Sequence, residues 1–224
     1  MTAIILQARI DSTRLPGKAL LPLAGKPLIL RVMEALNHIP SDLRILACPE
    51  DSFDCFSPLV EECGFEIFSG PKEDVLERFN MAIRKFSVKR VIRATGDNPF
   101  IFADAAAALN IEAQAASADY ASYTELPYGA GVECVAASAL LRAADETALP
   151  FDREHVCPYL YNHPELFNLH RPPAPSYWFY PDIRLTVDTQ EDYENAVRLY
   201  NALKDKPDRH QGSVIIEAYR AFQN

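Results

Sequence analysis

The chain has 224 residues, of which 49% are hydrophobic, and this length suits one α/β domain spanning residues 1–224 with a sizeable core. Its formal net charge of -9 argues against a general nucleic-acid binder, because a phosphate backbone requires a basic face. No apolar run approaches the ~20 residues of a membrane span, and the first strand begins too early for a signal peptide, so we expect a cytoplasmic protein without a membrane partner. The five cysteines are odd in number and lack Cys-x-x-Cys spacing, which is typical of reduced thiols.

The first half of the chain alternates between predicted strands and predicted helices. The strands are short apolar runs at Ile4–Leu6, Leu43–Ala47, Phe65–Phe68 and Arg90–Ala94. The helices show amphipathic or alanine-rich patterns at Pro27–Leu36, Ser52–Cys63, Glu73–Phe86 and about Asp104–Ala118. Repeated strand–helix units predict a mostly parallel sheet covered by helices on both faces, and therefore a three-layer α/β/α fold.

This regularity ends after Asp119. The stretch Tyr120–Val135 alternates and contains Pro127, Gly129 and Gly131, which predicts a hairpin or arm rather than another crossover. The remaining predicted elements are helices at Ser138–Asp145 and Arg153–Tyr161, a stiff connector at Pro172–Pro175, a short strand at Arg184–Asp188, and a helix from a Thr189 cap to about Leu203.

A loop rich in cations follows the first strand. Arg9, Arg14 and Lys18 lie within eleven positions of an otherwise acidic chain, where open α/β sheets bind ligands. Two guanidiniums and one ammonium suit a polyanion such as a nucleoside triphosphate; the alternative is a solvated loop with ordinary basic residues. A P-loop does not account for the segment, because Ser12 and Ala19 stand where that motif requires Gly and Ser or Thr.

The segment from Ala8 to Lys18 resembles the N-terminal signature of the cytidylyltransferases that activate 2-keto sugar acids. In that family an Ala-Arg pair is followed by a Ser and then by Arg-Leu-Pro-Gly-Lys, positions filled here by Ala8, Arg9, Ser12 and Arg14–Lys18. Segments at residues 70–78, 96–99, 152–156 and 187–192 are similar to the branch linked to spore-coat polysaccharide biosynthesis. The resemblance implies a Rossmann-like nucleotide-diphospho-sugar transferase fold, with a mostly parallel mixed sheet and an inserted arm at about residues 120–180.

Two aspartates are the candidate magnesium ligands. Asp97 lies in a Gly-Asp-x-Pro turn after a strand, and Asp188 lies in Val-Asp-Thr-Gln-Glu-Asp, where Gln190 replaces the family's usual proline. Family members carry magnesium ligands at both places, and magnesium typically takes one or two carboxylates together with substrate phosphates. The alternative for each aspartate is a structural one, a tight turn at Asp97 and a helix cap at Asp188.

The resemblance also assigns nucleotide-binding and acceptor-binding residues. Thr95 stands where ketodeoxyoctonate synthetases carry a Gln that helps to read cytosine, so the resemblance implies nucleotide binding more firmly than it implies specificity for cytosine. The expected nucleotide-binding residues are Ala8, Arg9, Ser12, Arg14, Lys18, Lys72, Arg78 and Thr95. The expected acceptor-binding residues are Tyr128, Glu133, Arg153, Glu154, His155 and Arg184. For residues 153–155 the alternative is a charged first helical turn.

The implied reaction is attack by a hydroxyl of a 2-keto sugar acid on the α-phosphorus of CTP, with release of pyrophosphate. Lys18, Arg14 and Asp97 are the expected catalytic residues, with Mg²⁺ as the cofactor. One alternative is a glycosyltransferase that uses a finished nucleotide sugar, although Asp97-Asn98-Pro99 does not supply its usual Asp-x-Asp motif. The other alternative is a non-catalytic nucleotide-binding assembly protein.

The expected arm also predicts a homodimer. Tyr120, Tyr123, Leu126 and Tyr128 on such an arm expose more apolar surface than a monomer normally leaves uncovered. A two-fold pairing through that surface would bury it.

Overall fold

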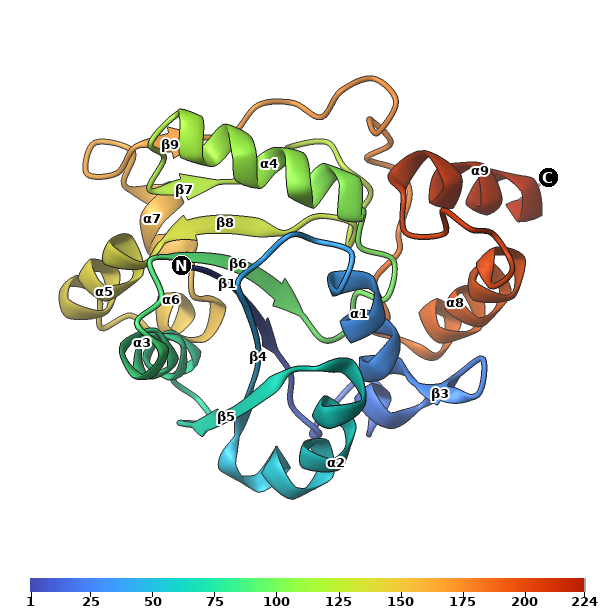
Figure 1. Cartoon of the computed structure of the whole chain (residues 1–224), viewed down its shortest axis with the longest axis horizontal. Helices are drawn as coiled ribbons and strands as arrows, with labels where there is room; N and C mark the ends of the chain where they lie inside the picture. Colours follow the sequence, from blue (N-terminus) through green and yellow to red (C-terminus); the bar gives the residue numbers. More distant parts are fainter. Residues whose placement is uncertain (224) are drawn as a thin grey trace.

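The computed structural model describes residues 1–223, built around a seven-stranded mixed sheet with helices on both faces (Figure 1). The strand order is β5-β4-β1-β6-β8-β7-β9. The bounds are β1 Thr2–Gln7, β4 Leu43–Pro49, β5 Glu66–Gly70, β6 Arg90–Thr95, β7 Tyr120–Ala121, β8 Glu133–Ala136 and β9 Leu169–His170. Only β8 runs against its neighbours, since β6 and β7 both pair with it antiparallel and every other pair in this sheet is parallel.

Alternation along the strands divides the core into two layers. Ile4 and Leu6 of β1 pack on one face, under α1 (Leu28–Leu36), α2 (Phe53–Cys63), α4 (Ala103–Ala115), α8 (Gln190–Leu203) and α9 (Gly212–Gln223). Ala3 and Ile5 pack on the other face, under α3 (Val75–Phe86), α5 (Ala137–Glu146), α6 (Pro150–His155) and α7 (Pro158–Asn162). Because successive side chains of a strand point to opposite faces, a strand buried on both sides reads as one continuous apolar run. The predicted three-layer α/β/α fold is confirmed.

Short elements complete the first half. A 3-10 helix, η1 (Lys18–Leu20), precedes a small hairpin of β2 (Pro22–Leu23) and β3 (Lys26–Pro27), and a second 3-10 helix, η2 (Glu50–Ser52), precedes α2. The first-half strands and helices match the predicted ranges to within a few residues at each end.

The expected arm is the main difference from the sequence prediction. Residues 120–136 carry β7 and β8, which extend the sheet beyond β6 instead of leaving it. Tyr120 is 3% exposed, and Tyr123 and Leu126 pack against the core, so only Tyr128 of the four proposed arm residues is strongly exposed. The apolar surface on which the dimer prediction was based is therefore largely buried within the chain itself.

Three smaller predictions also differ from the structure. The single helix predicted at residues 153–161 is two short helices, α6 and α7, because Val156 between them adopts φ 73° and ends the first. Residues 184–188 form no named strand, and only Arg184 makes an isolated bridge, to Tyr128. Helix α9 was not predicted. Within residues 1–223, no helix has the length and apolar character needed to cross a bilayer.

Candidate active site

A cleft of about 760 Å³ opens where β1 and β6 end. One side is formed by the loop after β1 and by the start of α3, and the other by β8, the loop after β7, and α6. Ligands of open α/β sheets bind at this carboxyl edge, because neighbouring strands there lead into diverging loops. Fourteen of the predicted site residues line this cleft: Ala8, Arg9, Ser12, Arg14, Lys18, Lys72, Arg78, Thr95, Asp97, Tyr128, Glu133, Glu154, His155 and Asp188.

Lys18 is the best-held cation of the loop. Gly17 before it adopts φ 68°, a left-handed conformation that costs glycine little, and the chain then enters η1 with Lys18 as its first residue. The Lys18 ammonium donates three hydrogen bonds of 2.9 Å, to Asp97 Oδ2, to Asp188 Oδ1 and to the carbonyl of Val187. All three of its donors are therefore used, and both predicted metal ligands are held at one point.

Asp97 is positioned by its own turn. The preceding Gly96 must be small, because a Cβ there would lie 2.9 Å from Ala8 Cβ and 2.9 Å from Ile29 Cδ1. Thr95 Oγ1 donates to Asp97 Oδ1 at 2.6 Å, so the threonine that replaces the family's glutamine orients the carboxylate. The Asp97 carbonyl accepts from the Val187 amide at 2.8 Å, which ties this turn to the segment that carries Asp188.

Asp188 is nearly buried and surrounded by cations. Its side chain is 8% exposed, and besides Lys18 it contacts Arg14 Nη2 and Arg184 Nη2, each at 3.0 Å. Burial raises the pKa of this carboxyl, but the hydrogen bond from Lys18 and the charges of Lys18 and Arg14 outweigh it, so the net pKa is lowered. Asp188 is thus an ionised carboxylate at neutral pH, as a metal ligand must be.

Asp192 fixes the segment that carries Asp188. It completes a capping box with Thr189, and its Oδ2 accepts from the Asp188 and Thr189 amides, both at 3.0 Å. Burial raises the Asp192 pKa, while Arg184 and the two amides lower it more strongly, to about 2. The helix-cap role considered for Asp188 therefore belongs to Thr189 and Asp192, and Asp188 is left facing the cleft.

The side of the cleft nearest α3 holds the remaining nucleotide candidates. Lys72 pairs with Asp11 Oδ2 at 2.6 Å and Asp51 Oδ2 at 2.8 Å, and these hydrogen bonds raise its pKa. Arg78 is 3% exposed and donates to the carbonyl of Pro71 at 2.6 Å, so it supports the loop that carries Lys72. Arg9 is half exposed and lies 4.0 Å from Asp11.

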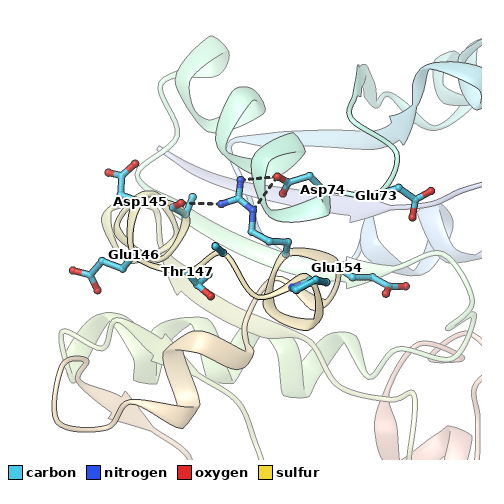
Figure 2. Close-up of a pocket in the computed structure, with 10 residues that line it drawn as sticks. Glu73, Asp74, Asp145, Glu146, Thr147 and Glu154 are labelled. Carbon is cyan, nitrogen blue, oxygen red and sulfur yellow. Dashed lines mark hydrogen bonds and ion pairs between the residues drawn. The ribbon is translucent and has the colours of Figure 1, made fainter.

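Two of the predicted acceptor-binding residues, both arginines, are not among the residues that line the cleft. Arg153 lies in a second hollow, where Nε (2.9 Å) and Nη2 (2.5 Å) contact Asp74 Oδ2 and Nη1 donates to the Ala144 carbonyl (Figure 2). Arg184 binds Asp188 and Asp192 and stacks on Tyr128, with its guanidinium carbon 5.1 Å from the ring centroid. Each guanidinium is paired with carboxylates of its own chain, and neither belongs to the residues that line the cleft.

Arg93 and Gln7 also line the cleft, but the sequence analysis did not predict them as site residues. Arg93 Nε donates to Gln7 Oε1 at 3.1 Å, and Nη1 pairs with Glu133, its register partner on β8. A signal was available, because Arg93 interrupts the otherwise apolar run Val91-Ile92-Ala94 in a strand expected to be buried on both faces.

The residues fit a magnesium ion. Two carboxylates, each 2.9 Å from the same ammonium, converge on one point that a small cation and Lys18 would share. Magnesium typically takes one or two carboxylates and completes its shell with phosphates and water. Within the described residues, no three His, Cys, Asp or Glu side chains are arranged to hold a metal. Asp97 and Asp188 would hold the magnesium ion.

A mixed sheet in this order, with a cationic loop meeting two carboxylates at its carboxyl edge, is the arrangement expected of an α/β nucleotidyltransferase. A family model described as "Cytidylyltransferase" matches residues 3–221, and the chain belongs to that family. The resemblance proposed from residues 8–18 is thereby confirmed.

The relatives agree with this membership. The chain is 35% identical over 214 residues to the spore coat polysaccharide biosynthesis protein SpsF of Bacillus subtilis, covering 91% of this chain and 88% of that one. It is 35% identical over 102 residues to a 3-deoxy-manno-octulosonate cytidylyltransferase of Anaeromyxobacter, covering 44% of this chain and 41% of the relative.

Solved structures show the same fold. A cytidylyltransferase from Leptospira borgpetersenii superposes with a TM-score of 0.89 at 24% identity, covering 99% of this chain and 94% of that one. A CMP:2-keto-3-deoxy-manno-octonic acid synthetase in complex with CTP gives a TM-score of 0.67 at 18% identity, covering 89% and 98%.

Proposed function

We propose that the protein transfers CMP from CTP to a hydroxyl of a 2-keto sugar acid, with magnesium as cofactor and pyrophosphate as the second product. The observation that carries the proposal is the meeting of Lys18 with Asp97 and Asp188 at the mouth of a cationic loop. A triphosphate needs fixed cations, and its metal needs carboxylates within reach of the same phosphates. This cleft offers both at one point.

Each residue has a definite part in the proposed reaction. Arg9 and Arg14 bind the β- and γ-phosphates, since these two loop cations are 51% and 66% exposed. Lys18 neutralises charge that develops on the departing pyrophosphate, and Asp97 and Asp188 hold the metal. The metal, when bound, would polarise the α-phosphate and lower the pKa of the acceptor hydroxyl.

The bond changes are simple. The acceptor oxygen forms a bond to the α-phosphorus, the bond from that phosphorus to the bridging oxygen breaks, and pyrophosphate leaves with the electron pair. The hydroxyl proton passes to water in the open cleft. Catalysis then rests on positioning and charge neutralisation, because such transfers need little covalent chemistry from side chains.

The names of the relatives support the proposed acceptor class and pathway. One relative is named for spore coat polysaccharide biosynthesis and others for transfer to 3-deoxy-manno-octulosonate, so we place this enzyme in the activation of a sugar acid for a surface polysaccharide. Thr95 orients Asp97 rather than offering an amide to the base, so discrimination against UTP is a separate question for the assay.

The test is pyrophosphate release from CTP and from the other three nucleotides, with magnesium and a panel of sugar acids. Release that requires CTP, magnesium and an acid supports the proposal. Consumption of a finished nucleotide sugar would favour the glycosyltransferase alternative, and nucleotide binding without turnover would favour the assembly protein. Homodimerisation stays a prediction, to be checked by light scattering at micromolar concentration.

A further inference from the structure

The half of the cleft formed by β6, β8, the loop after β7, and α6 contains very few positive charges. Within the described structure, the ionisable Arg, Lys, His, Asp and Glu residues that line this half are Arg93, Glu125, Glu133, Glu154 and His155. Arg93 is the one permanently charged cation in this set, against three glutamates. The other Lys and Arg residues that line the cleft are Arg9, Arg14 and Lys18 in the loop after β1, together with Lys72 and Arg78.

An acid bound in this half would therefore depend on Arg93. The carboxylate of an acceptor loses water when it enters a cleft, and that loss is costly unless a cation or several donors replace the water. Arg153 and Arg184 are committed to Asp74, Asp188 and Asp192. His155 is on the cleft wall, where its ring packs against that of Phe151 with the centroids 4.5 Å apart.

The geometry around Arg93 leaves it one usable edge. Nε is taken by Gln7 and Nη1 by Glu133, whose other oxygen accepts from the Tyr120 hydroxyl at 2.7 Å. Nη2 has no partner among the described residues, and it is not one of their buried unpartnered atoms, so it reaches the surface of the cleft. The side chain as a whole is only 13% exposed, which means that the group is rigidly held before any ligand arrives.

Arg93 also lies at a suitable distance from the reaction centre. It is two residues before Thr95 on β6, so both side chains are on the same face of the sheet, roughly 7 Å apart along the strand. Thr95 contacts Asp97, one of the two carboxylates that would hold the metal. An acceptor whose reacting hydroxyl and carboxylate are on adjacent carbons could present the first to the α-phosphate and the second toward Arg93.

We propose that Arg93, held by Gln7 and Glu133, binds the carboxylate of the acceptor and thereby selects sugar acids over neutral sugars. This inference rests on the proposed function and names a specificity-determining residue for it. Because Glu133 already offsets one positive charge and Glu154 lies on the same wall, the site favours a monoanion over a phosphorylated sugar that carries two charges. The Arg93–Glu133 ion pair is not needed for the stability of the fold, because a buried ion pair can often be replaced by apolar residues without loss of stability.

The test compares wild type, Arg93→Met and Arg93→Lys with the best sugar acid of the panel and with its carboxamide. Wild type should prefer the acid, and Arg93→Met should raise the KM for the acid about 10- to 100-fold, the loss expected for one charge-assisted hydrogen bond. The KM for the carboxamide and for CTP should stay within a few-fold, so that the variant no longer distinguishes acid from amide. Arg93→Lys should recover part of the preference.

Arg90→Met is the matched control. Arg90 begins the same strand, donates to the Ala118 carbonyl at 3.4 Å and does not line the cleft, so its loss should leave the acid preference unchanged. Equal increases in KM for acid and amide in Arg93→Met would overturn the proposal and leave Arg93 as a structural residue. An unchanged KM for the acid would overturn it as well.

A binding measurement separates this inference from the proposed function. With CTP and calcium present, the acid should raise the melting temperature of wild type and not that of Arg93→Met, whether or not turnover occurs. Acid-specific stabilisation that depends on Arg93, without pyrophosphate release, would support the carboxylate site and reject cytidylyl transfer. Turnover with neutral sugars only would support the transfer and reject the site.

Discussion

The ammonium of Lys18 lies 2.9 Å from Oδ1 of Asp188, although 170 positions separate the two residues in the sequence. The same ammonium lies 2.9 Å from Asp97 Oδ2, so it stands between the two carboxylates that would hold magnesium. If Asp97 and Asp188 hold magnesium as proposed, the metal would take oxygens that now accept from Lys18, and the ammonium would move toward the phosphates. Lys18 thus holds both carboxylates in place before a substrate arrives.

Lys18→Met should reduce turnover at least ~100-fold, while CTP affinity falls only several-fold, if Lys18 acts mainly on charge that develops in the transition state. Steady-state pyrophosphate release and CTP titration measure the two effects. Lys26→Met is the control, since Lys26 pairs with Glu34 and Glu62 and lines neither hollow described here. Equal losses in turnover and affinity would make Lys18 a plain binding contact.

Asp97→Asn and Asp188→Asn should each abolish magnesium-dependent turnover, but their stabilities should differ. Asp188 is 8% exposed and faces three cations, so its neutral variant should lose about 1–3 kcal/mol of stability. Asp97 is 28% exposed, and its variant should lose less. Thermal melts alongside activity assays measure both, with the exposed Asp205→Asn as the control. A Asp188→Asn variant with normal turnover would remove this carboxylate from the metal site.

The free energy of unfolding should fall in acid partly because Asp192, in the capping box of α8, becomes protonated. Its folded pKa is lowered to about 2, below the unfolded value of about 3.9, so its contribution to stability is complete above pH ~4 and is lost as the pH falls toward 2. Because its partner Arg184 is 42% exposed, solvent screens the ion pair, and we expect this contribution to be about 1 kcal/mol.

Denaturant unfolding at pH 6 and at pH 3 or below tests this. Asp192→Asn should be less stable than wild type at the higher pH, and the difference should shrink on acidification. Thr189→Ala removes the non-ionising half of the same capping box, so its deficit of about 1 kcal/mol should not vary with pH. A pH-independent deficit in Asp192→Asn would mean that the carboxylate acts only through geometry.

Two glycines should respond differently to alanine. Gly96→Ala places a Cβ 2.9 Å from Ala8 Cβ, so the end of β1 must move, and both melting temperature and CTP affinity should fall. Gly17→Ala meets no atom within 4 Å but must adopt φ 68°, at a cost of roughly 1–2 kcal/mol. Calorimetric melts and CTP titrations compare them. Wild-type CTP affinity in Gly96→Ala would show that the contact with Ala8 does not position the loop.

Local patterns determined the first half of the fold. The apolar strands, the helical periodicity between them and the turn at Gly96 are properties of contiguous residues, and they fix a parallel sheet almost without alternatives. The same is true of the cationic loop after β1 and of Thr189 as a helix cap, because each depends on neighbours within a few positions. Family membership followed from such segments alone.

Tertiary structure decided what depends on distant partners. Residues 120–136 read as an arm, because strands of two and four residues carry too little periodicity to be recognised, and only pairing with β6 places them in the sheet. Arg153 and Arg184 have the charge that an acceptor needs, but Asp74, Asp188 and Asp192 engage them. Arg93 gained its proposed role because Gln7 and Glu133 lie beside it only in the folded sheet. The position of each charge along the chain is known from the sequence, but only the fold decides which of these charges line the cleft.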